Sequence, residues 1–113
     1  MLNSEINEAI RLVFRQEDAL SRQIIGLLLH AKCIEKEETG IGYYATILFD
    51  NPVIGVEIPC MRDFNFSHPR FLYGGTFICT LLSVNKLELE AVSFGGELWP
   101  KKLNVEEFEP LDD

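Results

Sequence analysis

One group of residues in the sequence could support nucleophilic chemistry. Cys60, Asp63 and His68 lie close together in a segment rich in proline and aromatic residues. A catalytic thiol needs an adjacent base that a third group holds in place. No nucleophile motif surrounds these residues, so a buried thiol and an exposed imidazole are the favoured interpretation, and no catalytic residue is predicted. The alternative hypothesis is a small enzyme or ligand-binding domain that uses a loop at residues 60–73.

A second group consists of paired carboxylates. Glu88 and Glu90 alternate with Leu87, Leu89 and Ala91, and a period of two places the glutamates together on one face of a strand. Such a pair could serve acid–base or metal chemistry. The same alternation is typical of any strand with one solvated face. We favour the solvated face and predict neither a metal site nor a cofactor.

Cysteine usage and the start of the chain predict a reduced, cytoplasmic setting. Cys33, Cys60 and Cys79 are odd in number and widely spaced, without a C-x-x-C pair or a histidine at zinc-finger spacing. The first residues lack the basic and apolar segments of a signal peptide. No apolar run approaches the roughly 20 residues that span a bilayer. We therefore expect small buried thiols and no membrane segment.

The charge balance favours one class of partner. Ten Lys and Arg stand against eighteen Asp and Glu, which gives a formal net charge of −8. Phosphate backbones are bound by Lys and Arg, so nucleic-acid binding is disfavoured, and anionic membrane surfaces are disfavoured for the same reason. Solubility alone accounts for many acidic proteins. If the charge serves binding, the expected partner is a basic protein.

Length and hydrophobic periodicity predict a single α+β domain over residues 1–113. Apolar residues recur at helical spacing from residue 4 to about residue 30, with Asn3 or Ser4 as the N-cap. One long helix fits this pattern. A break near Asp18, with Asp18 capping a second helix, fits it equally. The apolar positions of the pattern include Ile6, Ile10, Val13, Ile24 and Leu28.

The remaining chain predicts an antiparallel sheet of about four to six strands, with the N-terminal helical segment packed on one face. Residues 33–38 and 43–49 form a hairpin around a glycine turn, and residues 53–58 form a short strand stopped by Pro59. Residues 60–73 are expected to be an ordered loop pinned by aromatic side chains. Residues 76–84 and 87–94 form a second hairpin that reverses at Asn85-Lys86.

Two segments resemble small bacterial proteins of unassigned function. These proteins have a TGxGFF-like strand start and a later LExxxYGxxWP-like element, which match TGIGYY at residues 39–44 and LEAVSFGGELWP at residues 89–100. The turn at Asn85-Lys86 departs from the pattern, because it lacks the usual glycine. The resemblance implies the same order of elements and a bacterial source, with no catalytic residue. By analogy, such small acidic domains are similar to immunity proteins that neutralise a toxin domain.

These observations favour a protein-binding module, immunity-like in its narrower form, that masks a basic partner with an acidic face. An enzyme is the less favoured class. Trp99 suits either a core position or an interface. A homodimer that pairs sheet edges is a third hypothesis. The residues predicted to contact the partner are Glu88, Glu90, Glu97, Tyr43, Tyr44 and Trp99.

Overall fold

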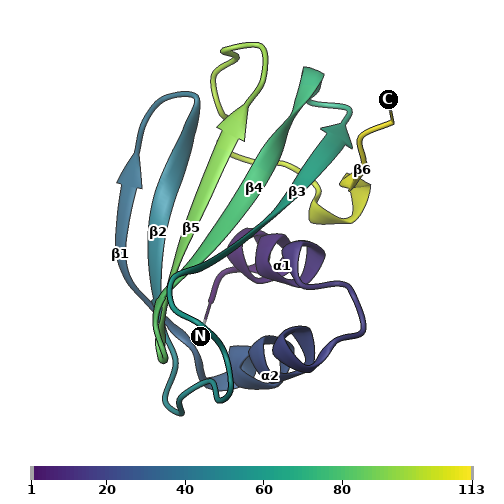
Figure 1. The fold of residues 1–113 in the computed structure, drawn as a ribbon. Helices are drawn as coiled ribbons and strands as arrows, with labels where there is room; N and C mark the ends of the chain where they lie inside the picture. Colours follow the sequence, from purple (N-terminus) through teal and green to yellow (C-terminus); the bar gives the residue numbers. More distant parts are fainter. Residues whose placement is uncertain (1, 113) are drawn as a thin grey trace.

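Two helices precede six strands in a computed structural model, which describes residues 2–112 (Figure 1). The chain also contains two single-turn 3-10 helices, η1 and η2. In order, the elements are α1 Ser4–Val13, α2 Ala19–Leu27, η1 Leu28–His30, β1 Lys32–Glu38, β2 Gly42–Leu48, β3 Cys60–His68, β4 Phe71–Ser83, β5 Lys86–Ser93, η2 Val105–Glu107 and β6 Glu109–Pro110. No helix of this described range is long and apolar enough to cross a bilayer.

The N-terminal helical segment breaks in two. The side chain of Asn3 accepts from the backbone N–H of Ile6 at 2.8 Å and starts α1. The side chain of Asp18 accepts from Ser21 N–H, also at 2.8 Å, and starts α2. Each cap satisfies a backbone donor that the first helical turn leaves free. The interpretation with a second helix capped by Asp18 is confirmed, and one continuous helix to residue 30 is wrong.

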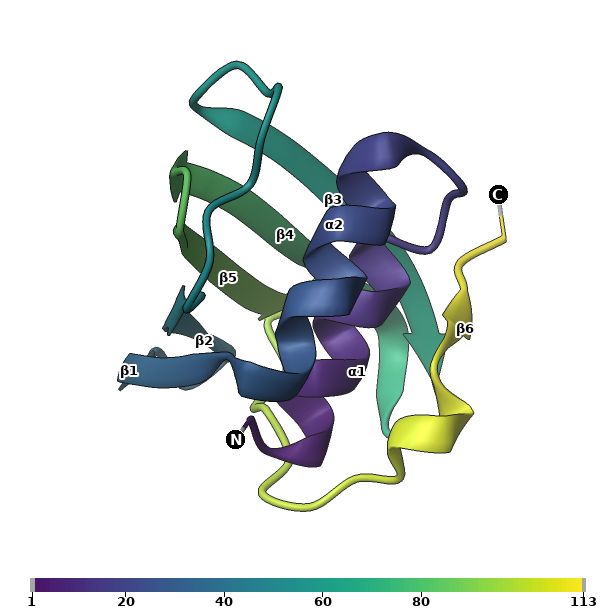
Figure 2. The same cartoon turned by 90° about the horizontal axis from the view of Figure 1, so that it is seen from below.

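All six strands join one antiparallel sheet in the order β1-β2-β5-β4-β3-β6. Both helices lie on the same face of it, as the view from below shows (Figure 2). The predicted α+β class is therefore confirmed, with the strand number at the upper end of the expected range. Both predicted hairpins form, and β4 lies inside the sheet. The second reversal falls at Val84-Asn85, one residue earlier than predicted.

The predicted loop at residues 60–73 is wrong, because this segment forms β3 and the start of β4. Phe64 and Phe66 point into the core, while Asp63 and Asn65 are exposed. This alternation of apolar and polar residues is typical of a strand with one buried face. Proline occupies the tight turn between the two strands, where it disturbs no ladder hydrogen bond.

The predicted short strand at residues 53–58 does not form. A side chain, and not a neighbouring strand, takes the backbone groups of Ile54. Gln23 donates its amide N–H to the Ile54 carbonyl and accepts from the Ile54 N–H, both at 2.9 Å. The backbone N–H of Val53 donates to the Val84 carbonyl at 2.7 Å and so joins this segment to the turn between β4 and β5. Helix α2 thus holds this segment as an irregular loop.

The core lies between the helices and the sheet, and aromatic rings dominate one end of it. Phe66 is fully buried, and its ring centroid lies 4.7 Å from that of Phe77 and 4.9 Å from that of Phe108. The apolar face of α1, which includes Ile6 and Ile10, packs on β3 and β4. Truncating a buried phenylalanine to alanine typically lowers the free energy of unfolding by about 3–5 kcal/mol. The cluster therefore contributes strongly to holding the helices on the sheet.

One ion pair ties the helical layer to the sheet. Arg62 on β3 donates to Asp18 at 2.8 Å and to the Ser21 hydroxyl at 3.0 Å. Its guanidinium also lies 5.7 Å from the centroid of the Phe14 ring. The hydrogen bond from Ser21 N–H, followed by that from Arg62, lowers the pKa of Asp18 from 3.8 to about 2.

The lowered pKa of Asp18 predicts how the stability of the fold depends on pH. The folded pKa of Asp18 is depressed, so its contribution is present above the unfolded pKa of 3.8 and is lost as the pH falls through about 2. Asp18→Asn keeps a good N-cap but removes the charge. We expect the variant to be less stable than wild type above pH ~4, and the difference to shrink towards pH ~2 in urea unfolding. A difference that is constant with pH would contradict this prediction. Glu17→Gln, which removes the adjacent carboxylate, is the matched control.

Candidate protein-binding face

The structure separates the residues considered for nucleophilic chemistry. Cys60 and His68 lie at opposite ends of β3, and eight steps along a strand span about 26 Å. Asp63 lies between them but is exposed on the other face from His68, which is buried. No base therefore reaches the Cys60 thiol from this group.

His68 is fully engaged in structural hydrogen bonds. Its Nδ1 accepts from the Arg70 backbone N–H at 3.0 Å, so Nε2 carries the proton and donates to the Asn104 carbonyl at 2.8 Å. A surface depression of about 440 Å³ passes beside it, lined by Ser67, His68, Pro69, Glu106, Glu107 and Glu109. Because both imidazole nitrogens are occupied, this depression offers no free base.

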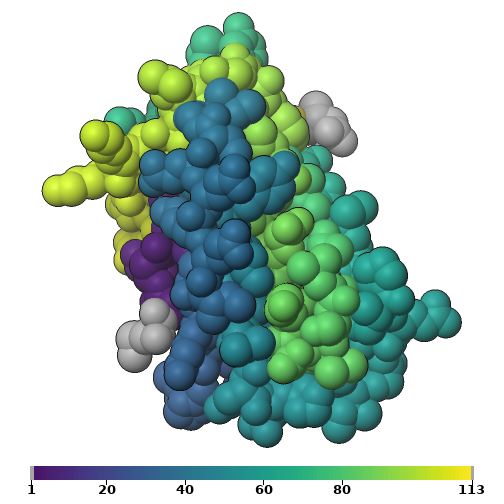
Figure 3. Space-filling model, turned by 90° about the vertical axis from the view of Figure 1, so that its left-hand side faces the viewer, coloured from purple at the N-terminus to yellow at the C-terminus, as the bar shows by residue number. Residues whose placement is uncertain are grey.

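The face of the sheet opposite the helices is open. In Figure 3, β1 runs along the front, and the green and teal strand segments to its right carry no helix. Two rows of side chains cross this open side, each with one residue from every strand between β1 and β3. We call these rows the acidic face; they run Glu37–Tyr44–Glu90–Ile78–Asp63 and Glu35–Thr46–Glu88–Thr80–Met61.

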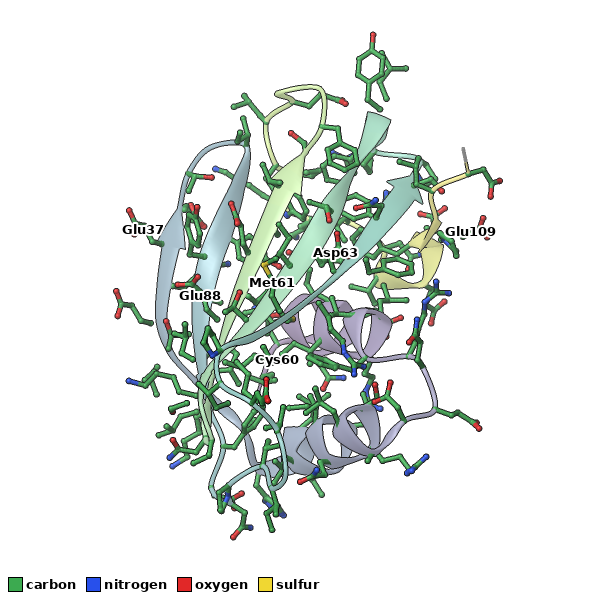
Figure 4. All side chains as sticks on the ribbon, viewed as in Figure 1. Glu37, Cys60, Met61, Asp63, Glu88 and Glu109 are labelled. Atoms are coloured by element: carbon green, nitrogen blue, oxygen red, sulfur yellow. The ribbon has the colours of Figure 1, made fainter. Side chains whose placement is uncertain are left out.

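The two rows of the acidic face carry five carboxylates, and the next row on the same side, Lys32–Leu48–Lys86, borders them with two lysines. Figure 4 labels Glu37, Glu88, Met61 and Asp63, which come from three different strands of this face. Across the strands, the neutral residues Tyr44, Thr46 and Ile78 separate one carboxylate from the next. The closest carboxylates are two residues apart on one strand, as in Glu88 and Glu90, and so point to the same side of the sheet.

The pKa of Tyr44 reflects the carboxylates around it. It stands between Glu37 on β1 and Glu90 on β5. Hydrogen bonding to Glu90 raises the pKa of the Tyr44 hydroxyl, and the charges of Glu90, Glu88 and Glu37 add to the effect. A phenolate at this position would be repelled by its neighbours. Tyr44 therefore stays a neutral donor with an accessible ring, 37% exposed.

The structure brings together only three of the predicted contact residues, namely Tyr44, Glu88 and Glu90. Tyr43 and Trp99 lie on the helix side. Tyr43 is 2% exposed. Trp99 is half-buried and packs its ring 4.8 Å from that of Phe71. These two aromatic residues therefore belong to the inner side of the sheet and not to the acidic face.

Glu97 has a structural role in the turn after β5. Its Oε1 accepts from the backbone N–H groups of Leu72 and Tyr73, at 2.8 and 3.3 Å. The carboxylate thus fixes the start of β4. It lies beyond the last residue that β5 pairs with β4, Ser93, and so is outside the two rows of the acidic face.

Three carboxylates of the acidic face were not predicted as contacts. Glu35 and Glu37 alternate along β1 as Glu88 and Glu90 do along β5, and the predicted hairpin would have placed them beside Tyr44. Asp63 was missed because residues 60–73 were expected to be a loop. Among residues 2–112, no three His, Cys, Asp or Glu side chains converge to hold a metal ion.

Comparisons with known proteins do not identify a relative. No protein-family model, curated protein or solved structure matches the chain. The resemblance to small bacterial proteins, carried by residues 39–44 and 89–100, therefore stays a prediction.

The crowding of charge around Tyr44 can be measured. We expect Tyr44 to ionise above the ordinary value of 10.0, and Glu90→Gln to lower its pKa, because the variant removes the largest cause of the rise. A pH titration followed by NMR, with Tyr44→Phe to assign the resonance, measures both values. Glu109→Gln, at the far edge of the sheet (Figure 4), is the control and should leave Tyr44 unchanged. Equal effects of the two variants would contradict this arrangement.

Proposed function

We propose that this protein is a protein-binding module whose acidic face docks a basic protein partner. The observation that carries the proposal is a sheet face that no helix covers and that gathers five carboxylates in two adjacent rows. Complementary fields of this kind speed encounter and suppress wrong partners. The net charge of −8 supports the same sign of partner.

Side chains with apolar surface within the acidic face would supply the anchors. Tyr44 and Met61 are 37% and 69% exposed, and Ile78 is partly buried between Glu90 and Asp63. Binding energy usually concentrates in a few such residues, whereas rim charges mainly set the rate of association. The mechanism is electrostatic steering followed by occlusion of the partner around Tyr44.

In its narrower form, the proposal is an immunity-like protein that masks a basic toxin domain in the cytoplasm. The resemblance of residues 39–44 and 89–100 to small bacterial proteins supports this form. Three free thiols, at Cys33, Cys60 and Cys79, suit a reducing compartment. A masking function requires the partner to be inhibited when the acidic face is covered, which binding alone would not establish.

Pairing of sheet edges between two copies has less support. The exposed edge strand β1 has a register shift between Cys33 and Glu35. Five of its seven residues are charged, and all seven are exposed. Bulges and charges are the usual protection of an edge against further pairing. The homodimer is therefore not the function proposed.

If the acidic face binds a basic protein, Glu88 and Glu90 should contribute more to binding than glutamates elsewhere on the surface. Wild-type protein immobilised at low salt should retain a basic protein from lysate of the source organism and release it as salt rises. Glu88→Lys with Glu90→Lys should weaken that association by roughly tenfold or more, because coupling between close charge pairs at interfaces is on the order of 1.5 kcal/mol or above. Affinity of the identified protein for each variant is then measured by titration calorimetry.

A second charge reversal provides the matched control. Glu106→Lys with Glu107→Lys changes the formal net charge from −8 to −4, as the first double variant does, since each substitution adds two positive charges. These exposed glutamates lie outside the acidic face. We expect this variant to bind almost as well as wild type. Equal losses in both variants would show a response to net charge and would contradict a specific face.

A further inference from the structure

The outer edge of β3 is only partly covered. In the order of the sheet, β4 pairs with one side of β3 and β6 with the other. Strand β6 pairs with Phe66 and Ser67, and one further hydrogen bond on this side runs from the Leu111 N–H to the Asn65 carbonyl at 3.0 Å. Figure 2 shows β3 as the outermost long strand, with β6 beside one end of it. Within the described range 2–112, no strand covers this side of β3 at residues 60–64.

The backbone groups of Met61 and Asp63 point to this uncovered side. In an antiparallel strand the N–H and C=O groups of successive residues point to opposite sides. The Asn65 carbonyl points to β6, so the groups two and four residues before it point the same way. Among residues 2–112, no backbone group of a turn or loop bonds to Met61 or Asp63. Two N–H donors and two C=O acceptors are therefore free to pair with an added strand.

This edge also has the regular geometry that strand addition requires. The pairing of β3 with β4 runs without a register shift from Cys60 to Phe66. The opposite edge of the sheet, β1, has a shift between Cys33 and Glu35. A bulge hinders further pairing, whereas a regular extended edge is a template for another strand. Of the two edges, the uncovered part of β3 is therefore the better acceptor.

The side chains along the edge determine which segment fits. On the open side, Met61 and Asp63 are the last members of the two rows of the acidic face, and Met61 is 69% exposed. On the helix side lie the guanidinium groups of Arg62 and Arg15, the latter 4.8 Å from the centroid of the Phe64 ring. Opposite charges on adjacent strands stabilise a sheet and like charges destabilise it. An added strand is therefore favoured with a cation on the open side and an uncharged residue on the helix side.

A second copy of this chain fits the edge less well. Two copies of β3 that pair about a twofold axis can bring the free groups together only with Met61 opposite Asp63 of the other copy. This register places Arg62 directly opposite its own counterpart, and like charges in that position are destabilising. The expected occupant is therefore a different chain.

We propose that the uncovered edge of β3 accepts an extended segment of the basic partner as an additional antiparallel strand. The inference rests on the proposed function, because it states how the partner of the acidic face is held. Two residues of the segment lie opposite Met61 and Asp63, exchange hydrogen bonds with them, and carry Lys or Arg on the open side. The residue between them is uncharged and lies on the helix side. Main-chain hydrogen bonds supply affinity, and the alternate side chains supply specificity.

The test is an NMR titration of the full chain with a synthetic peptide of four Thr-Lys repeats, blocked at both ends. In the free chain, the amides of Met61 and Asp63 should exchange with solvent faster than the amide of Arg62, which points to β4. Bound peptide should shift these two amides and protect them from exchange. The proposal is overturned if the three amides are equally protected in the free chain, or if the peptide leaves their exchange unchanged.

Two changes to the peptide test the pairing on wild-type protein. An isomer with four threonines followed by four lysines has the same charge but no alternation, and it should bind several-fold more weakly. N-methylation of the lysines, whose N–H groups face β3, should weaken binding roughly tenfold, the effect of losing two hydrogen bonds. N-methylation of the threonines, whose N–H groups face away from β3, should change the affinity much less. Equal effects of the two methylations would overturn the proposal.

A pair of protein variants separates this inference from the proposed function. Met61→Pro removes one free N–H, and proline is tolerated where the N–H of an edge strand faces solvent. It should weaken peptide binding roughly tenfold, because the ring also blocks the added strand, while Met61→Ala keeps the N–H and should lose much less. Equal binding by both variants would overturn strand addition, even if Glu88→Lys with Glu90→Lys still weakened capture of the basic protein. Weakening by Met61→Pro alone, without any effect of the charge reversal, would support strand addition and contradict docking on the acidic face.

Discussion

The packing of α1 and α2 against a single face of the sheet is the constraint on which the rest of the structure depends. Ile6 and Ile10 of α1 are buried against β3 and β4. Side chains of a strand alternate between its two faces, so covering one face commits Leu89 to the core and leaves Glu88 and Glu90 half-exposed on the other. Strands β2, β3 and β5 all show this division. The residues of the acidic face on these three strands are the ones that it leaves on the open side.

The same division gives neighbouring residues separate roles. Tyr43 and Tyr44 are adjacent in β2, yet one lies buried beside a cavity and the other is exposed between glutamates. The pKa of each hydroxyl is raised, chiefly by burial at Tyr43 and by Glu90 at Tyr44. The buried core and the acidic face therefore use opposite faces of the same sheet.

Local patterns predicted the parts of the fold that local interactions determine. The alternation through Glu88 and Glu90 placed both on the solvated face, and the capping preference of Asp18 allowed the break between helices. Residues 60–73 were misinterpreted because proline and polar residues hid the alternation around Phe64. The conformation at Ile54 depends on Gln23, a contact between distant parts of the chain that no local pattern contains. The burial of Tyr43 likewise depends on packing between distant segments.

The most direct test of the central claim is to map where a basic chain binds. An oligolysine peptide titrated at low salt and followed by NMR samples all acidic surfaces at once, including the acidic segment at residues 106–112. We expect the largest shifts at Tyr44, Thr46, Glu88 and Glu90, and we expect them to disappear as salt rises. Shifts that centre on residues 106–112, or that spread evenly over the surface, would contradict it.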